Sequence, residues 1–182
     1  MAYLAPTLLL SMPQLVDPNF ARSVVLLCEH AAEGAFGLVV NRPSDISAAE
    51  AVRLEPALLA PNDLPLLIGG PVEPQRGWIL TAQPPEDVEH RGVGAGLYLS
   101  ASPLLLRRVL SSRPLPRRTH VLAGYAGWGP GQLDEELAQS AWLTLPVELD
   151  LIFEIPAAAA WEMAIRRLGA DPHALQMGHG VH

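Results

Sequence analysis

Two short and almost uninterrupted apolar runs constrain the fold more than any other feature of this chain. Residues 23–29 read Ser-Val-Val-Leu-Leu-Cys-Glu and residues 36–41 read Phe-Gly-Leu-Val-Val-Asn, and a polar turn with Gly34 separates them. Short valine-rich runs joined by a glycine-containing turn predict a β-hairpin. Since the runs do not alternate between polar and apolar residues, other parts of the chain must cover both faces of the hairpin. We therefore expect a central hairpin in a domain that mixes strands and helices.

The size and composition of the chain are those of one domain with a large apolar core. Its 182 residues are 49% hydrophobic, and Cys28 is the only cysteine, so no disulfide can form within the chain. No apolar stretch approaches the roughly 18 to 20 residues that cross a bilayer, and no secretory leader pattern is present. These features predict a single domain over residues 1–182, located in the cytoplasm and not in a membrane.

Local signals place further elements along the chain. Ser47 stands three residues before Glu50, the spacing of a capping box, and Ser102 is an N-cap residue followed by proline. Helices are expected at 47–54, 103–110, 132–140 and 156–168. Strands are expected at 66–72, 77–81, 96–100, 120–125, 142–145 and 150–153, the first two as a second hairpin-like unit. Residues 171–182 carry little patterning and are expected to form a mobile tail.

A glycine-rich segment, Gly-Tyr-Ala-Gly-Trp-Gly-Pro-Gly-Gln-Leu at 124–133, connects an expected strand to an expected helix. It lacks the Lys and Ser/Thr of a phosphate-binding P-loop and does not match the dinucleotide-binding fingerprint. Two interpretations stay open. The glycines permit close packing around a buried Trp128, or the segment presents Trp128 as a surface for a ligand or partner. The exposure of Trp128 distinguishes them.

Loops at the ends of apolar strands carry the remaining candidate binding residues, since loops on a rigid scaffold often carry function. If residues 41–43 and 69–77 converge with the segment around Trp128, Arg42 and Arg76 would form a cationic site for an anion or a carboxylate-bearing partner. The alternative is that both arginines pair with nearby carboxylates. The candidate surface consists of Asn41, Arg42, Gly70, Pro71, Arg76, Tyr125, Trp128 and Gln132.

Cys28 and His30 are the one candidate nucleophile and base, because residues two apart on a strand share a face. The alternative is that Cys28 is a small buried hydrophobe and His30 belongs to the turn. His173, His179 and His182 have no carboxylates arranged around them, so no metal site is expected, and no cofactor pattern occurs.

The formal net charge of −7 repels the phosphate backbone and so disfavours nonspecific nucleic-acid binding by the surface as a whole. Nucleic-acid binding would need a local stripe of arginines. The candidates for such a stripe are Arg107, Arg108, Arg113, Arg117 and Arg118.

Several spaced blocks stand out together: Ser11-Met-Pro13, Asp17-Pro-Asn-Phe-Ala-Arg-Ser-Val-Val25, Cys28-Glu-His30, Gly37-Leu-Val-Val-Asn-Arg-Pro43, Gly69-Gly-Pro-Val72, Gly96-Leu-Tyr-Leu99, Gly124 to Leu133 and Ala141-Trp142. In this order and over nearly the whole chain they resemble the bacterial AlgH/YqgE family. The resemblance implies a single α+β domain with a bifurcated, barrel-like mixed β-sheet surrounding helices, and a bacterial cytoplasmic location. Family members are described as transcriptional regulators, named for a link to alginate control, although they lack a helix-turn-helix. The resemblance supplies no catalytic residue.

The leading functional expectation is therefore a noncatalytic regulatory or interaction protein that binds a protein partner or a small ligand through the candidate surface. One alternative is a nucleic-acid-binding regulator that uses the arginine stripe. The second alternative is an enzyme that uses Cys28 and His30.

Overall fold

The computed structural model describes residues 3–13, 15 and 17–177, which form one α+β domain built on a ten-stranded sheet. Along the main path the strand order is β10-β1-β2-β3-β9-β6-β8-β7, and β5 and β4 branch from it. The strands are β1 (Thr7–Ser11), β2 (Val24–Ala31), β3 (Gly34–Val39), β4 (Pro43–Ser47), β5 (Pro65–Ile68), β6 (Val72–Thr81), β7 (Arg91–Gly94), β8 (Leu97–Ser100), β9 (Thr119–Trp128) and β10 (Trp142–Leu145). The helices are the short 3-10 turn η1 (Pro18–Phe20), α1 (Ala48–Ala51), α2 (Pro103–Ser111), α3 (Gln132–Ala138), α4 (Leu149–Phe153), α5 (Ala157–Arg167) and α6 (Pro172–Met177).

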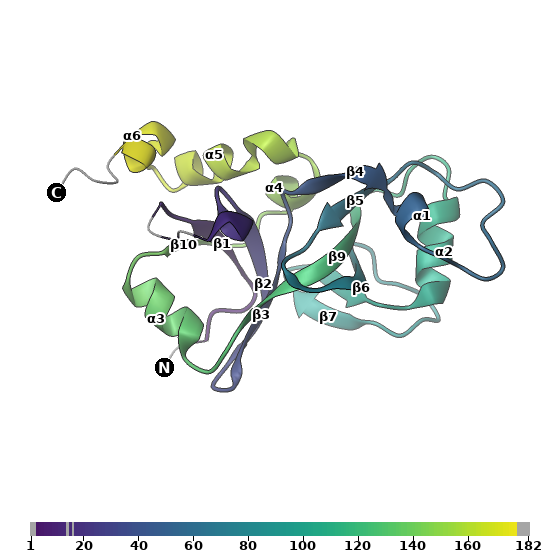
Figure 1. The fold of residues 1–182 in the computed structure, drawn as a ribbon, viewed down its shortest axis with the longest axis horizontal. Coiled ribbons are helices and arrows are strands. Elements are labelled where there is room, and N and C mark those ends of the chain that lie inside the picture. Colours follow the sequence, from purple (N-terminus) through teal and green to yellow (C-terminus); the bar gives the residue numbers. More distant parts are fainter. Residues whose placement is uncertain (1–2, 14, 16, 178–182) are drawn as a thin grey trace.

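The sheet branches at β9, the long strand near the middle of the molecule (Figure 1). The last residues of β9 pair with β3, with Trp128 opposite Ala35. Its first residues lie between β6, which is antiparallel, and β5, which is parallel. The expected mixed and bifurcated sheet in a single α+β domain is thus confirmed, and β9 is the strand that both branches share.

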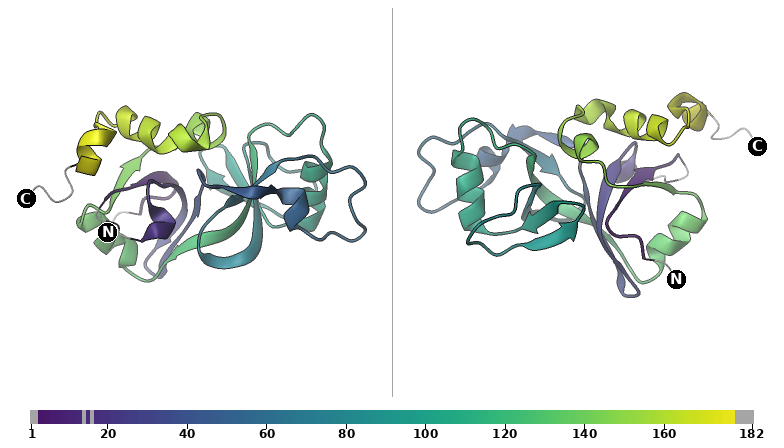
Figure 2. Two further views of the ribbon diagram at one scale, coloured as in Figure 1. Left: turned by 45° about the horizontal axis from the view of Figure 1, so that its top comes forward. Right: turned by 180° about the vertical axis from the view of Figure 1, so that it is seen from behind.

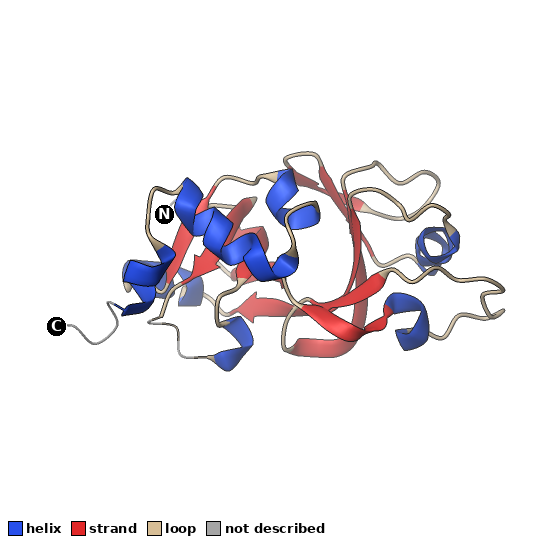
Figure 3. Ribbon diagram, turned by 90° about the horizontal axis from the view of Figure 1, so that it is seen from above, coloured by secondary structure: helices blue, strands red, loops and turns tan. Residues whose placement is uncertain are grey.

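The central hairpin is confirmed as β2 and β3, which pair antiparallel with Leu26 opposite Leu38. Both of its faces are buried, as its continuous apolarity requires. One face, with Leu26, packs against α4 and α5, and the indole N–H of Trp161 in α5 donates to the Ser11 carbonyl at 2.9 Å. α5 lies across β1 and β2 (Figures 1 and 3). The other face packs against Trp128 and α3.

A separate apolar cluster forms at the opposite end of the molecule, where α1 and α2 lie together beyond β5 and β9 (Figure 2). Ser47 and Glu50 form the expected capping box of α1, and Ser102 caps α2 with Pro103 following it. Leu105 and Leu110 of α2 pack against Ile79 of β6. This cluster holds both helices against the sheet.

Two expectations about local structure are wrong. β5 and β6 do not form a hairpin with each other, because β9 lies between them and pairs with both. The segment 150–153, expected to be a strand, lies in helix α4, since a short apolar run fits either element and long-range packing decides. Strands β1, β4 and β7 lie where no strand was expected.

Residues 172–177, expected to belong to a mobile tail, form α6, and Leu175 packs against the core. His179 and His182 lie outside the described residues. None of the helices described here is long and apolar enough to cross a membrane.

Candidate functional site

Trp128 belongs to the core, with only 7% of its surface exposed. Its ring contacts Phe20 and Trp142, and its indole N–H donates to Glu136 Oε1 at 3.1 Å. The indole N–H of Trp142 donates to the same oxygen at 2.8 Å. Gln132 donates to the second carboxylate oxygen of Glu136 and accepts from the Gly129 N–H. The glycine-rich segment therefore fixes a strand-to-helix connection around a buried tryptophan pair.

The glycines at 70 and 124 serve a close crossing of two backbones. A Cβ on Gly70 would lie 2.1 Å from the carbonyl carbon of Tyr125, and a Cβ on Gly124 would lie 2.3 Å from the Gly70 oxygen. Both residues also have positive φ angles, a conformation that side chains disfavour. This crossing places the 69–71 turn against β9, so that β6, which begins at Val72, pairs with β9.

Asn41 and Arg42 hold the loop around η1 in place. Asn41 accepts from the Val24 N–H and donates to the Arg22 carbonyl. Arg42 donates to the carbonyls of Asn19 and Ala21. The guanidinium of Arg42 thus binds backbone carbonyls of the chain itself. The alternative that Arg42 pairs with a nearby carboxylate is therefore wrong.

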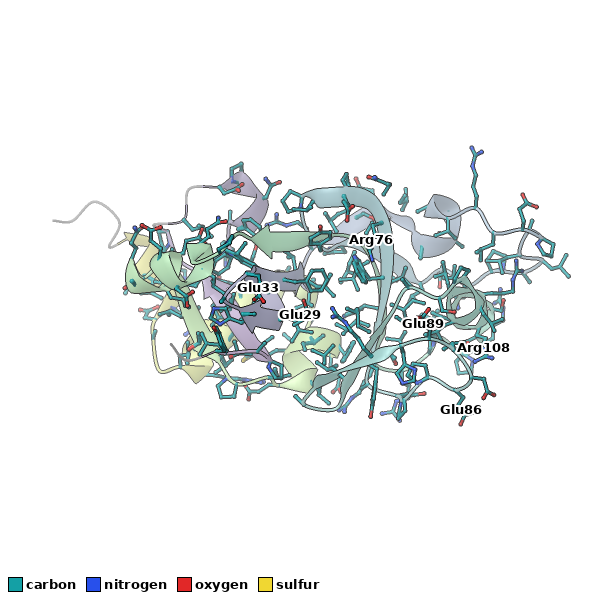
Figure 4. The ribbon with its side chains drawn as sticks, turned by 90° about the horizontal axis from the view of Figure 1, so that it is seen from below. Glu29, Glu33, Arg76, Glu86, Glu89 and Arg108 are labelled. Carbon is teal, nitrogen blue, oxygen red and sulfur yellow. The ribbon has the colours of Figure 1, made fainter. Side chains whose placement is uncertain are left out.

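Arg76 and Tyr125 lie in an aromatic cluster on the face of the sheet opposite to Trp128. Tyr125 contacts Phe36 and Trp78, and the Arg76 guanidinium lies 4.5 Å from the centre of the Trp78 ring. In the view of Figure 4, Arg76 lies between Glu29 and Glu33 on one side and Glu89 and Arg108 on the other. Burial and the nearby Glu73 carboxylate raise the pKa of Tyr125.

The structure therefore does not bring the eight candidate residues together on one surface. Tyr125 and Trp128 lie an odd number of positions apart on β9, so their side chains point to opposite faces. Arg42 binds the η1 loop, and Arg76 lies 3.6 Å from Glu73. A cationic site shared by Arg42 and Arg76 is not formed.

Cys28 and His30 do not share a face either, because a β-bulge lies between them. Leu27 pairs with Gly37 and Glu29 pairs with Phe36, which leaves Cys28 as the extra residue and reverses the alternation after it. Cys28 faces the core shared with α4 and α5, and burial raises its pKa to about 12. A thiol with this pKa is not a nucleophile at neutral pH.

His30 lies on the other face, 92% buried, where its Nδ1 accepts from the Leu4 N–H at 3.1 Å. This bond assigns the ring proton to Nε2. Nε2 lies 3.2 Å from Asp134 Oδ1, but the orientation of the two groups does not make a hydrogen bond. The described residues contain no cluster of three or more His, Cys, Asp or Glu side chains fit to hold a metal.

Most of the arginines in the proposed stripe bind loops of the protein itself. Arg107 and Arg113 donate to backbone carbonyls of the 56–61 loop, and Arg108 donates to the Glu86 carbonyl. Arg118 pairs with Glu154 at 2.6 Å. These guanidinium groups organise the surface of the chain, and four of the five candidates already have partners.

A hollow of about 450 Å³ lies beside β6, and we call it the β6 hollow. The hollow forms where β6 and β8 separate. The two strands pair from Ile79, opposite Ser100, onward. The residues of β6 before Ile79 are therefore not paired with the segment that leads from β8 into α2. Its lining consists of Ala51, Val52, Arg53, Leu54, Leu66, Pro74, Gln75, Gly77, Trp78, Ile79, Ala101, Ser102, Pro103, Leu106, Val121, Leu122 and Ala123. A volume of this size is typical of sites for small ligands.

Gly77 keeps the floor of the β6 hollow open. A Cβ added at this residue would meet no atom nearer than the Leu122 oxygen at 4.0 Å, and its φ is not in the left-handed region. A side chain at this position would therefore extend into free space. Trp78, next to it, also lines a second hollow of about 390 Å³ with Arg91 and His90, and its indole N–H has no hydrogen-bond partner in the described part of the chain.

None of the candidate residues predicted from the sequence lines the β6 hollow. The only local signal for it is Gly77, a glycine inside an apolar strand pattern, which indicates a bulge or a close approach to the strand. The remaining walls come from α1, α2, β5 and β9, which are separate in the sequence and meet in the folded chain.

The domain is thus of the α+β class, with a branched sheet, helices at both ends and an open hollow beside β6. The chain belongs to the AlgH/YqgE family: the model of the AlgH-like family matches residues 8–173. The solution structure of the AlgH protein from Pseudomonas aeruginosa superposes with a TM-score of 0.79 at 35% identity, covering 97% of this chain and 94% of that one. A crystal structure from Corynebacterium diphtheriae has the same fold, with a TM-score of 0.67 at 23% identity over 91% and 88% of the two chains.

Similar sequences extend over the whole chain. A protein from Anaeromyxobacter dehalogenans is 44% identical over 98% of this chain and 95% of its own length. A protein from Myxococcus xanthus is 41% identical over the full length of both. Both carry only the family name UPF0301, which states no activity.

Proposed function

We propose that this chain is a noncatalytic regulatory protein of the cytoplasm that binds a small ligand in the β6 hollow. The observation that carries the proposal is the hollow itself, with its apolar walls and a floor that Gly77 leaves open. The separation of Cys28 and His30 onto opposite faces supports the absence of catalysis, because it removes the one candidate nucleophile and base. A protein partner remains the alternative occupant, in which case an apolar side chain would enter the same hollow.

A regulatory role follows from the elements that form the walls. α1, α2 and β6 contribute to one hollow, and the long 52–64 segment begins at its rim. A ligand that contacts all of them favours the conformation in which they are held together, and ligands shift equilibria only through such differential contacts. Ligand binding would therefore stabilise this arrangement of α1, α2 and β6, and with it the surface that they present to a partner.

Substitution of Gly77 by valine tests this proposal, because the new side chain fills the hollow without a clash. The matched control is Gly92→Val: Gly92 is also an exposed strand glycine with no atom within 4 Å of an added Cβ, and it lines none of the described hollows. Binding of neutral fluorinated aromatic fragments is followed by fluorine NMR. We expect wild type and Gly92→Val to bind a common subset that Gly77→Val does not. Equal binding by all three proteins, or binding by none, would remove the proposal.

A further inference from the structure

The lining of the β6 hollow carries one charge, and that charge is positive. Arg53 is its only ionisable residue, and no aspartate or glutamate contributes to it. The chain as a whole has 19 acidic and 12 basic residues, so a hollow without a carboxylate departs from the average of the surface. A cation beside an apolar volume is complementary to a molecule that has both an apolar body and an anionic group.

The other described hollows differ in this respect, because each of their arginines has an acidic or backbone partner. Arg118 pairs with Glu154, Arg91 with Glu29, and Arg22 with Glu162. In the hollow near residue 113, Arg113 donates to the carbonyls of Ala60 and Pro61. Arg53 makes no ion pair or side-chain hydrogen bond within the described residues. Arg53 is exposed, so its guanidinium donors are accessible to a ligand.

The end of α1 places Arg53 at the rim of the β6 hollow. The nearest acidic residue within α1, Glu50, uses its carboxylate in the capping box, where it accepts from the Ser47 N–H at 3.0 Å. α1 ends at Ala51, and Val52 is already extended, which carries Arg53 past the helix to the rim of the hollow. The first turn of α2, with Ser102 and Pro103, forms part of the same rim and adds the positive end of a helix dipole.

We infer that the ligand of the β6 hollow is an amphipathic carboxylate or a similar monoanion, with its apolar body against Leu66, Ile79 and Leu106 and its anionic group at Arg53. This inference rests on the proposed function, because it names the chemistry of the ligand that the hollow holds. The apolar walls provide affinity, and Arg53 selects the sign of the charge. Selection by charge is a separate property from occupancy, so the two can be tested separately.

Three probes with the same eight-carbon chain separate charge from apolar contact: sodium octanoate, 1-octanol and octylammonium chloride. Binding to the native protein is measured by isothermal titration calorimetry below the concentrations at which the probes aggregate. We expect octanoate to bind about tenfold or more tightly than octylammonium, since a charge-assisted hydrogen bond contributes on this scale. Octanol is expected to fall between them.

Substitution of Arg53 by glutamine should weaken octanoate binding about tenfold and leave octanol binding unchanged. Arg117→Gln is the matched control, because Arg117 is exposed and its side chain has no ion pair or hydrogen bond in the described structure. The inference would be overturned if wild type bound octanoate and octylammonium with equal affinity, or if Arg53→Gln bound octanoate as tightly as wild type. Octanol binding in the same experiment would still support the proposed function. If none of the three probes binds to wild type, both fail.

Discussion

Trp128 and Trp142 donate their indole N–H groups to the same carboxylate oxygen of Glu136, at 3.1 and 2.8 Å. The two rings also contact each other edge to face, with centroids 6.0 Å apart. One acidic residue in α3 thus satisfies two buried donors from different strands. The three residues join β9, α3 and β10 into one unit.

Loss of this unit should destabilise the protein strongly. Trp128→Ala removes a buried ring and is expected to lower the free energy of unfolding by about 3 to 5 kcal/mol. Glu136→Ala leaves both indole N–H groups without an acceptor and should cost about 2 to 4 kcal/mol. Urea unfolding followed by tryptophan fluorescence measures both changes. Glu135→Ala, on the exposed side of α3, is the control and should change stability by less than about 0.5 kcal/mol. A Trp128→Ala protein of wild-type stability would show that Trp128 is not part of the core.

Two glycines in neighbouring segments should respond in opposite ways to alanine. Gly70→Ala places a Cβ 2.1 Å from the Tyr125 backbone, and neither backbone can move without breaking the sheet, so we expect a loss of at least about 3 kcal/mol. Gly77→Ala meets no close atom and should raise stability by about 0.4 to 1 kcal/mol, because it restricts the unfolded chain. Chemical unfolding of both variants checks this contrast. A large loss in Gly77→Ala would mean that the floor of the β6 hollow is already filled.

Cys28 should be inert toward alkylation in the native protein. Burial holds its pKa at about 12, so almost no thiolate is present at pH 8, and the residue is only 9% exposed. Treatment with iodoacetamide at pH 8, followed by mass spectrometry, should show labelling in urea and none under native conditions. Rapid native labelling would return Cys28 to the list of candidate nucleophiles.

His120 should make stability depend on pH below neutrality. Burial lowers the pKa of His120 below its ordinary value, and the hydrogen bond to the Ile152 carbonyl offsets this in part. Since the pKa is lower in the folded state, the unfolded chain takes up the proton first as the pH falls. The stabilisation is therefore present above about pH 6.5 and is lost as the pH falls toward the folded pKa. We measure the free energy of unfolding at pH 7.5 and at pH 5.5. Between these values it should decrease less for His120→Gln than for wild type, whereas His90→Gln, at an exposed site, should behave as wild type.

The elements that short sequence motifs determine were predicted correctly. The β2–β3 hairpin has two apolar runs and a glycine turn, and α1 and α2 have N-cap residues that the structure confirms. The pairing of β9 with both β5 and β6 has no such signal, because it depends on contacts between residues that are far apart in the sequence, such as Thr81 with Thr119 and Leu66 with Val121. The bulge at Cys28 is likewise not visible in an uninterrupted apolar run, and it separates Cys28 from His30.

The candidate site was predicted less well than the fold, for a physical reason. Asn41 and Arg42 stand out as polar residues at the end of an apolar strand, and Trp128 as an aromatic residue between glycines, but each makes contacts that hold the fold together. The β6 hollow is lined mainly by ordinary apolar residues. It exists because two strands diverge and two helices meet them, and no single residue type indicates this.

The central claim is that the β6 hollow is a ligand site, and an NMR titration of the ¹⁵N-labelled protein with sodium octanoate tests it most directly. The account predicts saturable shifts of the backbone amides of Gly77, Ile79 and Val121, with the η1 loop and the region around Trp128 unchanged. In the same titration of Gly77→Val, the amide signals of Ile79 and Val121 should not shift. Saturable shifts confined to other parts of the surface, or no saturable shift in wild type, would contradict the claim.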